Sequence, residues 1–166
     1  MTADAANRKA CRNEFTRLLT LAMVTNVQIV DSVIGYETVN VEGKSCVVVT
    51  SNGSRRGKRG ISDDRWNNSF LFEVLSFVEK ANTLSENQGG SNWTEKDVED
   101  KLDDIDKYIA DVVAANRSNP GQWSYIQFTD DYSDIIAGRE RFIDRISETI
   151  PYKVESRLVE IQYIES

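Results

Sequence analysis

The chain has 166 residues, 40% of them hydrophobic and 28% charged, and its 20 Lys and Arg against 27 Asp and Glu give a formal net charge of −7. This length and composition are typical of a globular protein, and we expect one domain over residues 1–166. The sequence contains no histidine, which excludes catalytic systems that pair a serine or cysteine nucleophile with that base.

The sequence also predicts no membrane partner and an intracellular location. No apolar stretch approaches the roughly 18 to 20 residues that a membrane-spanning helix needs, and the polar start lacks the apolar segment of a secretory signal. In such a compartment the two distant cysteines, Cys11 and Cys46, favour buried thiols over a disulfide. Two cysteines alone cannot build a zinc site, so we expect no metal and no cofactor.

The first elements along the chain are a helix and a β-rich stretch. Apolar residues recur at helical spacing over about residues 3–23 and predict a helix with one buried face: Cys11, Phe15, Leu18 and Ala22. Residues 27–41 are rich in β-branched side chains. Gly35 and Gly43 are expected to divide that stretch into two short strands.

A cationic, glycine-rich segment follows between two predicted strands. Residues 44–50 and 65–79 are apolar enough to form strands, and residues 51–61 between them carry Arg55, Arg56, Lys58 and Arg59. This pattern predicts a long hairpin arm, and long arms of this kind either carry function or remain disordered.

The partner of this arm can be a protein, DNA or solvent alone. The glycines would let a phosphate backbone approach closely, but the chain is acidic overall and no aromatic residue lies between the cations to stack on bases. The acidic face of the helix predicted over residues 93–117 is a better match on a neighbouring copy. Such a head-to-tail contact can close into a ring.

The strand after the arm is apolar on both faces. Phe70, Phe72, Val74 and Val78 alternate with Leu71, Leu75 and Phe77. The two expected helices can cover one face, whereas the other must be covered within the same domain or by another chain. Both alternatives are open, and the second makes Leu71, Leu75 and Phe77 candidate contacts between subunits.

The remaining elements are a long helix and several strands. Residues 93–117 have helical apolar spacing, with Thr94 as the N-cap and carboxylates on the outer face. Residues 123–128 predict a strand, 130–138 a turn-rich connection, and 139–150 either a strand or a short helix. The closing strand begins at Tyr152, and its apolar alternation changes phase, which predicts a bulge near residues 156–158.

The candidates for catalysis are pairs of adjacent carboxylates. Asp63-Asp64, Asp103-Asp104 and Asp130-Asp131 carry oxygen ligands of the kind that Mg²⁺ prefers, so a metal-dependent nuclease is one possible enzyme. Adjacent residues of a strand point to opposite faces, however, and acidic pairs are common in turns. The basic segment also lacks the Gly-Lys-Ser/Thr ending of a phosphate-binding loop. We therefore expect a protein that is not an enzyme.

The order of these elements resembles the tail terminator, or tail completion, proteins of long-tailed bacteriophages. The resemblance covers about residues 6 to 164 and depends on the N-terminal helix, the hairpin arm, the strand from Trp66 to Leu75, the long helix and the closing strand from Arg157 to Tyr163. It implies an α+β fold, in which two main helices pack on one face of a mostly antiparallel sheet that carries a long β-hairpin arm.

The resemblance also implies a function in the virion. Such a protein, assembled in the host cytoplasm, forms a ring, expected to be a hexamer, that caps the tail tube, ends its polymerisation and meets the connector or neck of the head. Genomic DNA would pass through the lumen without specific binding. The residues expected to contact neighbours are Arg55, Arg56, Lys58, Arg59, Leu71, Leu75 and Phe77. The alternatives are a head-side connector or neck protein and a DNA-binding accessory protein that uses the basic arm over residues 54–60.

Overall fold

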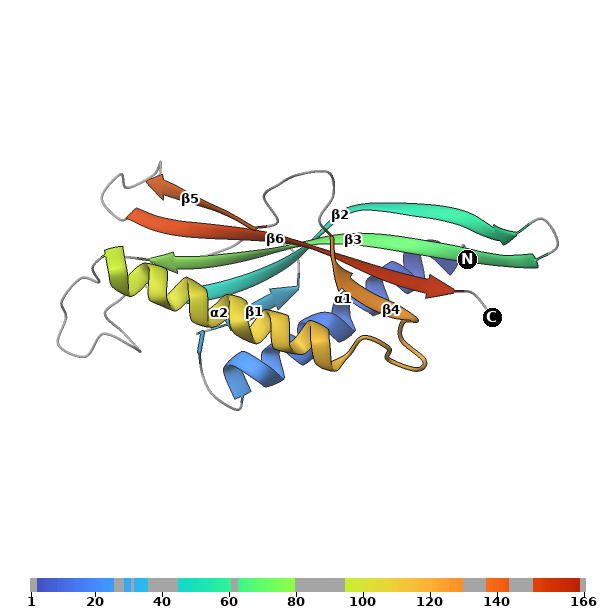
Figure 1. The fold of residues 1–166 in the computed structure, drawn as a ribbon, viewed down its shortest axis with the longest axis horizontal. Coiled ribbons are helices and arrows are strands. Elements are labelled where there is room, and N and C mark those ends of the chain that lie inside the picture. The colour runs from blue at the N-terminus through green and yellow to red at the C-terminus, as the bar shows by residue number, and fades with distance from the viewer. Residues whose placement is uncertain are drawn as a thin grey trace.

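The described residues fold into two long helices and one sheet (Figure 1). The computed structural model describes residues 3–25, 29–30, 32–35, 45–60, 63–79, 95–129, 137–143 and 151–164. Their elements are α1 (Ala3–Thr20) with a π-helical turn η1 (Leu21–Thr25), β1 (Ser32–Gly35), β2 (Ser45–Gly60), β3 (Asp63–Glu79), α2 (Glu95–Ala115), β4 (Tyr125–Phe128), β5 (Ala137–Ile143) and β6 (Pro151–Ile164). This is the α+β class with a mostly antiparallel sheet that the sequence predicts.

The sheet has six strands in the order β1-β2-β3-β6-β4, and β5 also pairs with β6. Only β1 and β2 run parallel, whereas the other pairs are antiparallel. The long strands β2, β3 and β6 form the centre. On its other edge, β6 pairs with β5 over its first half and with β4 over its second half.

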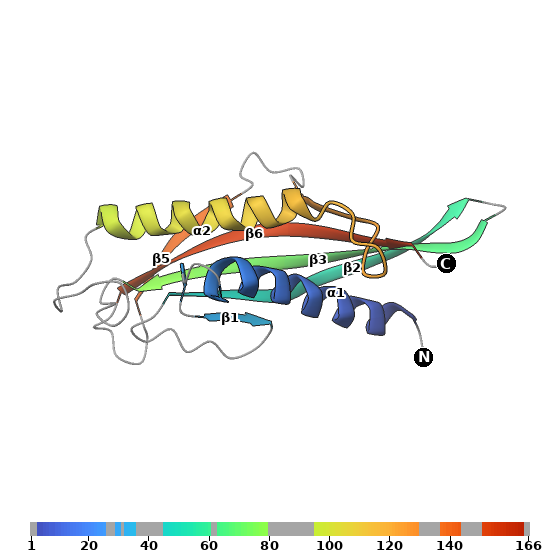
Figure 2. The same cartoon turned by 90° about the horizontal axis from the view of Figure 1, so that it is seen from below.

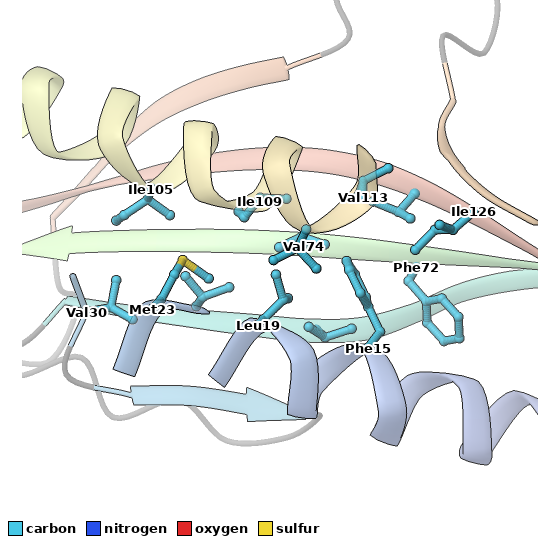
Figure 3. Packing of buried hydrophobic residues seen from close by; sticks show 14 of the residues in the cluster. Phe15, Leu19, Met23, Val30, Phe72, Val74, Ile105, Ile109, Val113 and Ile126 are labelled. Carbon is cyan, nitrogen blue, oxygen red and sulfur yellow. The ribbon is translucent and has the colours of Figure 1, made fainter. Parts of the chain in front are cut away.

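Both helices lie on the same face of the sheet, which we call the helix face (Figure 2). Helix α1 forms because its apolar residues fall on one stripe, and Cys11, Phe15 and Leu19 are fully buried there. From α2, Leu102, Ile105 and Ile109 are buried against the same core. Figure 3 shows Phe15 and Leu19 of α1 and Ile109 of α2 on the side of their helices that faces β3. The core therefore occupies one layer between the helices and the sheet.

The opposite face of the sheet, which we call the second face, is less completely buried. Strand β3 alternates strictly, with Phe70, Phe72, Val74 and Val78 fully buried on the helix face. On the second face of β3, the described side chains include Leu71, Leu75 and Phe77, which are half-buried. On β2, Cys46 and Val48 pair with Phe77 and Leu75 and are fully buried. The second face is thus covered at one end and partly exposed along β3.

Two details differ from the sequence prediction. Strand β6 contains no bulge near residues 156–158, because its pairing with β3 runs in one register from Tyr152 to Ile164. The apparent change of phase arises because two charged residues, Glu155 and Arg157, are buried on the helix face, while Leu158 lies half-buried on the second face. Strand β2 is also longer than the strand predicted over residues 44–50, since it continues to Gly60.

Of the segment predicted as a strand or a short helix over residues 139–150, the described residues 139–143 belong to the strand β5 (Ala137–Ile143). Several other predictions lie outside the described residues. These are the second short strand before residue 45, the N-cap Thr94 and the carboxylate pair Asp130-Asp131.

Candidate assembly interface

The cationic segment belongs to an antiparallel hairpin between β2 and β3. Its backbone pairs Arg55 with Ser69, Arg56 with Asn68 and Lys58 with Trp66, and the last pair is Gly60 with Asp63. The register shifts by one residue between Ser51 and Gly53 and again between Lys58 and Gly60. Gly53 has a φ of 141°, which side chains on other residues rarely tolerate, so glycine is the residue that fits this shift.

The end of this hairpin is a two-stranded ribbon within the described residues. Strand β6 pairs with β3 only as far as Asn67, so the pairs nearer the tip have no third strand beside them. Figure 1 shows this end of the hairpin at one extreme of the long axis. The side chains of Arg55, Arg56, Lys58 and Arg59 lie outside the described part of the structure, and their contact with a neighbour stays a prediction.

Helix α1 adds cations next to the hairpin. Arg8 Nη1 donates to Ser54 Oγ at 3.4 Å and Arg12 Nη1 donates to Ser51 Oγ at 3.1 Å, while Lys9 is exposed. We call this part of the chain, α1 together with hairpin residues 51–60 and 63–66, the basic end. The sequence does not predict that α1 lies beside the hairpin. It indicates only that Arg8 and Arg12, four residues apart, lie on one side of a helix.

Helix α2 has the opposite charge. Over Glu95–Ala115 it carries eight carboxylates and three lysines, a formal charge of −5. Asp97, Asp100, Asp103, Asp104 and Asp111 are exposed on its outer side, which we call the acidic face. Lys96 Nζ lies 2.6 Å from Asp100 Oδ2, and this contact raises the pKa of the lysine. The lysines therefore neutralise only part of the negative charge.

The second face places apolar and polar side chains side by side. Leu71, Leu75 and Phe77 of β3 are half-buried, as is Leu158 of β6. Between them, Ser156 Oγ donates to Glu73 Oε1 at 3.0 Å.

A second polar group lies further along the same face. The side-chain amides of Gln127 and Gln162 both donate to Glu160 Oε1, at 3.1 and 2.9 Å. This mixture of half-buried leucine and phenylalanine with satisfied polar groups is typical of surfaces that bind proteins.

Polar contacts tie α2 to the sheet and α1 to the turn that follows α2. Arg157 on the helix face donates to Asp106 Oδ1 of α2 at 2.5 Å, and its guanidinium lies 3.8 Å from the ring centre of Phe128. On α1, Glu14 accepts from Arg17 at 2.6 Å and from Asn119 at 3.3 Å. The hydrogen bond from Arg17 lowers the pKa of Glu14 despite partial burial.

The described residues supply little for catalysis. They contain no group of three or more His, Cys, Asp or Glu side chains that could hold a metal ion. Of the carboxylate pairs, Asp103 and Asp104 lie exposed on α2. Cys11 and Cys46 are free and buried, and burial raises the pKa of the Cys11 thiol to about 12, which makes it a poor nucleophile.

No helix in the described ranges has the length and apolar character needed to cross a membrane. Comparison with known proteins adds no relative. No model of a known protein family matches the sequence, and a search of curated proteins finds no match.

Proposed function

We propose that this chain is a structural protein of the tail terminator type, which assembles with copies of itself into a ring on the tail tube of a long-tailed phage. In this function it ends tail polymerisation and presents a surface to the connector or neck of the head. It acts by binding neighbours and catalyses no reaction. The ring, the tail tube and the passage of genomic DNA come from the resemblance of the element order.

The observation that carries the proposal is the uneven cover of the sheet. Both helices pack on the helix face, whereas Leu71, Leu75 and Phe77 are half-buried on the second face. At roughly 25 cal/mol per Å² of apolar surface removed from water, covering these three side chains by a neighbour would stabilise an assembly. The hairpin adds a second candidate contact, because its two-stranded end is marginal by itself in water.

Electron microscopy of the purified protein tests this proposal. Closed rings of uniform diameter are expected in negative stain, and the same rings should bind to one end of tail tubes. The variant Leu75→Ser with Phe77→Ser should reduce ring formation, while Asn13→Ser, at an exposed site on α1, should not. A protein that forms no rings and does not bind tail tubes would refute the proposal. Rings that occur at the head vertex instead would favour the connector function.

The DNA-binding alternative is favoured by one observation, the basic end. Its cations on α1 and the hairpin could pair with phosphates, and binding would then fall steeply with salt. A gel-shift titration at several salt concentrations tests it. DNA binding would be supported over assembly if the DNA affinity falls steeply with salt and this dependence disappears in the variant with four alanines, at Arg55, Arg56, Lys58 and Arg59.

A further inference from the structure

The molecule has two surfaces of opposite charge. The basic end combines α1 with hairpin residues 51–60 and 63–66, which together contain nine Lys and Arg and four Asp and Glu, a formal charge of +5. The acidic face belongs to α2, which has a formal charge of −5. Although the net charge of the chain is −7, positive and negative charge are therefore concentrated in different elements.

The two helices contact each other, but their first turns are far apart in one molecule. Figures 1 and 2 show the hairpin and the start of α1 at one end of the long axis, and the start of α2 at the other. Both helices are packed on the sheet through their apolar residues, so neither can swing round to meet the other surface. The hairpin and the first turns of α1 can consequently meet the first turns of α2 only between two molecules.

The structure also indicates how the hairpin would bind. Within the described residues, β1 pairs with β2 only over Cys46–Val49, so β2 is an edge strand from Thr50 to Gly60. Edge strands can bind a partner by adding a strand, but charged side chains and register shifts oppose this, and the hairpin has both. Recognition by charge is therefore favoured over strand addition.

We propose that the basic end of one copy binds the acidic face of α2 on a second copy, in a head-to-tail contact. The proposal depends on the self-assembly proposed above and names the surfaces that meet. Lys9 and the hairpin cations would face exposed carboxylates such as Asp100 and Asp104. Because each copy has one surface of each kind, the contact repeats from copy to copy and closes into a ring or extends as a filament.

Reciprocal charge reversal tests this contact. One variant, the cation variant, carries Lys9→Glu, Arg55→Glu and Arg56→Glu. The other, the acid variant, carries Asp100→Lys, Asp103→Lys and Asp104→Lys, which change the formal charge of α2 from −5 to +1. Each alone should weaken self-association at least tenfold, measured by analytical ultracentrifugation in low salt, because like charges then face each other. Circular dichroism confirms that each variant remains folded.

Mixing the two variants is the decisive step. In an alternating assembly, the basic end of the acid variant meets the unchanged acidic face of the cation variant, and the two reversed surfaces meet each other. Every contact is again between opposite charges, so equimolar mixing should restore the wild-type mass. DNA or another protein as the true partner of the basic end predicts no recovery, and that result would overturn the proposal.

A single-residue control separates this contact from net charge. Lys107→Glu changes the charge of the chain by the same amount as Lys9→Glu, but it lies exposed on α2 and makes the acidic face more negative. It should strengthen self-association, whereas Lys9→Glu should weaken it. If both substitutions shift self-association in the same direction, the proposed contact is wrong. The same holds if the wild-type protein is an oligomer and none of these variants changes its mass, although self-assembly itself would then still stand. A wild-type protein that stays monomeric would refute both.

Discussion

Replacing Asp106 with asparagine removes one partner of the ion pair that ties α2 to the sheet. Arg157 Nη1 and Asp106 Oδ1 lie 2.5 Å apart, with side-chain exposures of 11% for the arginine and 29% for the aspartate. The substituted asparagine would keep the shape of the side chain but lose its charge. The guanidinium would then remain largely buried without its carboxylate, and its Nε already lacks a hydrogen-bond partner.

The expected loss of stability follows from the partial burial of this ion pair. Breaking a fully buried pair by removing one partner costs about 3–5 kcal/mol, and a solvent-exposed pair contributes about 0–1 kcal/mol. Because Asp106 is partly exposed, water can reach the arginine, and we expect Asp106→Asn to lower the free energy of unfolding by about 2 kcal/mol. At a urea dependence of about 2 kcal/mol per M, the midpoint would fall by about 1 M.

Urea unfolding at pH 7, followed by circular dichroism, measures this effect. Urea is uncharged and does not screen the pair, and all samples need one protein concentration because self-association stabilises the folded chain. Asp104→Asn is the matched control, since it makes the same change at an exposed position of the same helix and should cost less than about 0.5 kcal/mol. Equal midpoints for the two variants would refute the structural importance of the pair.

Three further predictions concern the hairpin, a thiol and the second face. Gly53→Ala should lower the free energy of unfolding by about 1–2 kcal/mol, because the φ of 141° is strained for alanine, and an unchanged urea midpoint would contradict this. Cys11, with its pKa near 12, should react with iodoacetamide at pH 8 at least about 10³-fold more slowly in the folded protein than in urea, and rapid labelling of native protein would show that the site opens. Leu75→Ser with Phe77→Ser should reduce self-association measured by sedimentation, and unaltered sedimentation would exclude the second face from the interface.

Apolar periodicity was enough to predict most of the fold. The helix expected over residues 93–117 corresponds to α2 (Glu95–Ala115), and the helix expected over residues 3–23 to α1 and η1. In both cases the spacing of the apolar residues reports the face that packs on the sheet. The alternation in β3 likewise separated the helix face, where Phe72 and Val74 are buried, from the second face.

The bulge predicted in β6 was wrong because the prediction assumed that every buried position is apolar. Glu155 and Arg157 occupy positions on the helix face, and the arginine is paired there with Asp106 from α2. A partner 51 residues away in the chain leaves no local signal in the strand. Burial of charge is therefore a tertiary effect that periodicity does not detect.

The candidate site was predicted in part. The hairpin arm and its cations are apparent from the sequence, but the strand was predicted to end at residue 50, because glycine and lysine are depleted in strands. The pairing partner overrides this local preference. The contribution of α1 to the basic end depends on contacts between residues 8 and 54 and between residues 12 and 51, which only the folded chain brings together.

The solution mass at two salt concentrations tests the central claim most directly. Light scattering in about 50 mM salt should give a mass of several chains, each of 18.8 kDa, because the basic end and the acidic face attract each other between copies. At about 1 M salt, where charges are screened within about 3 Å, the same sample should dissociate towards smaller species. A mass of one chain at low salt and high protein concentration would contradict the account.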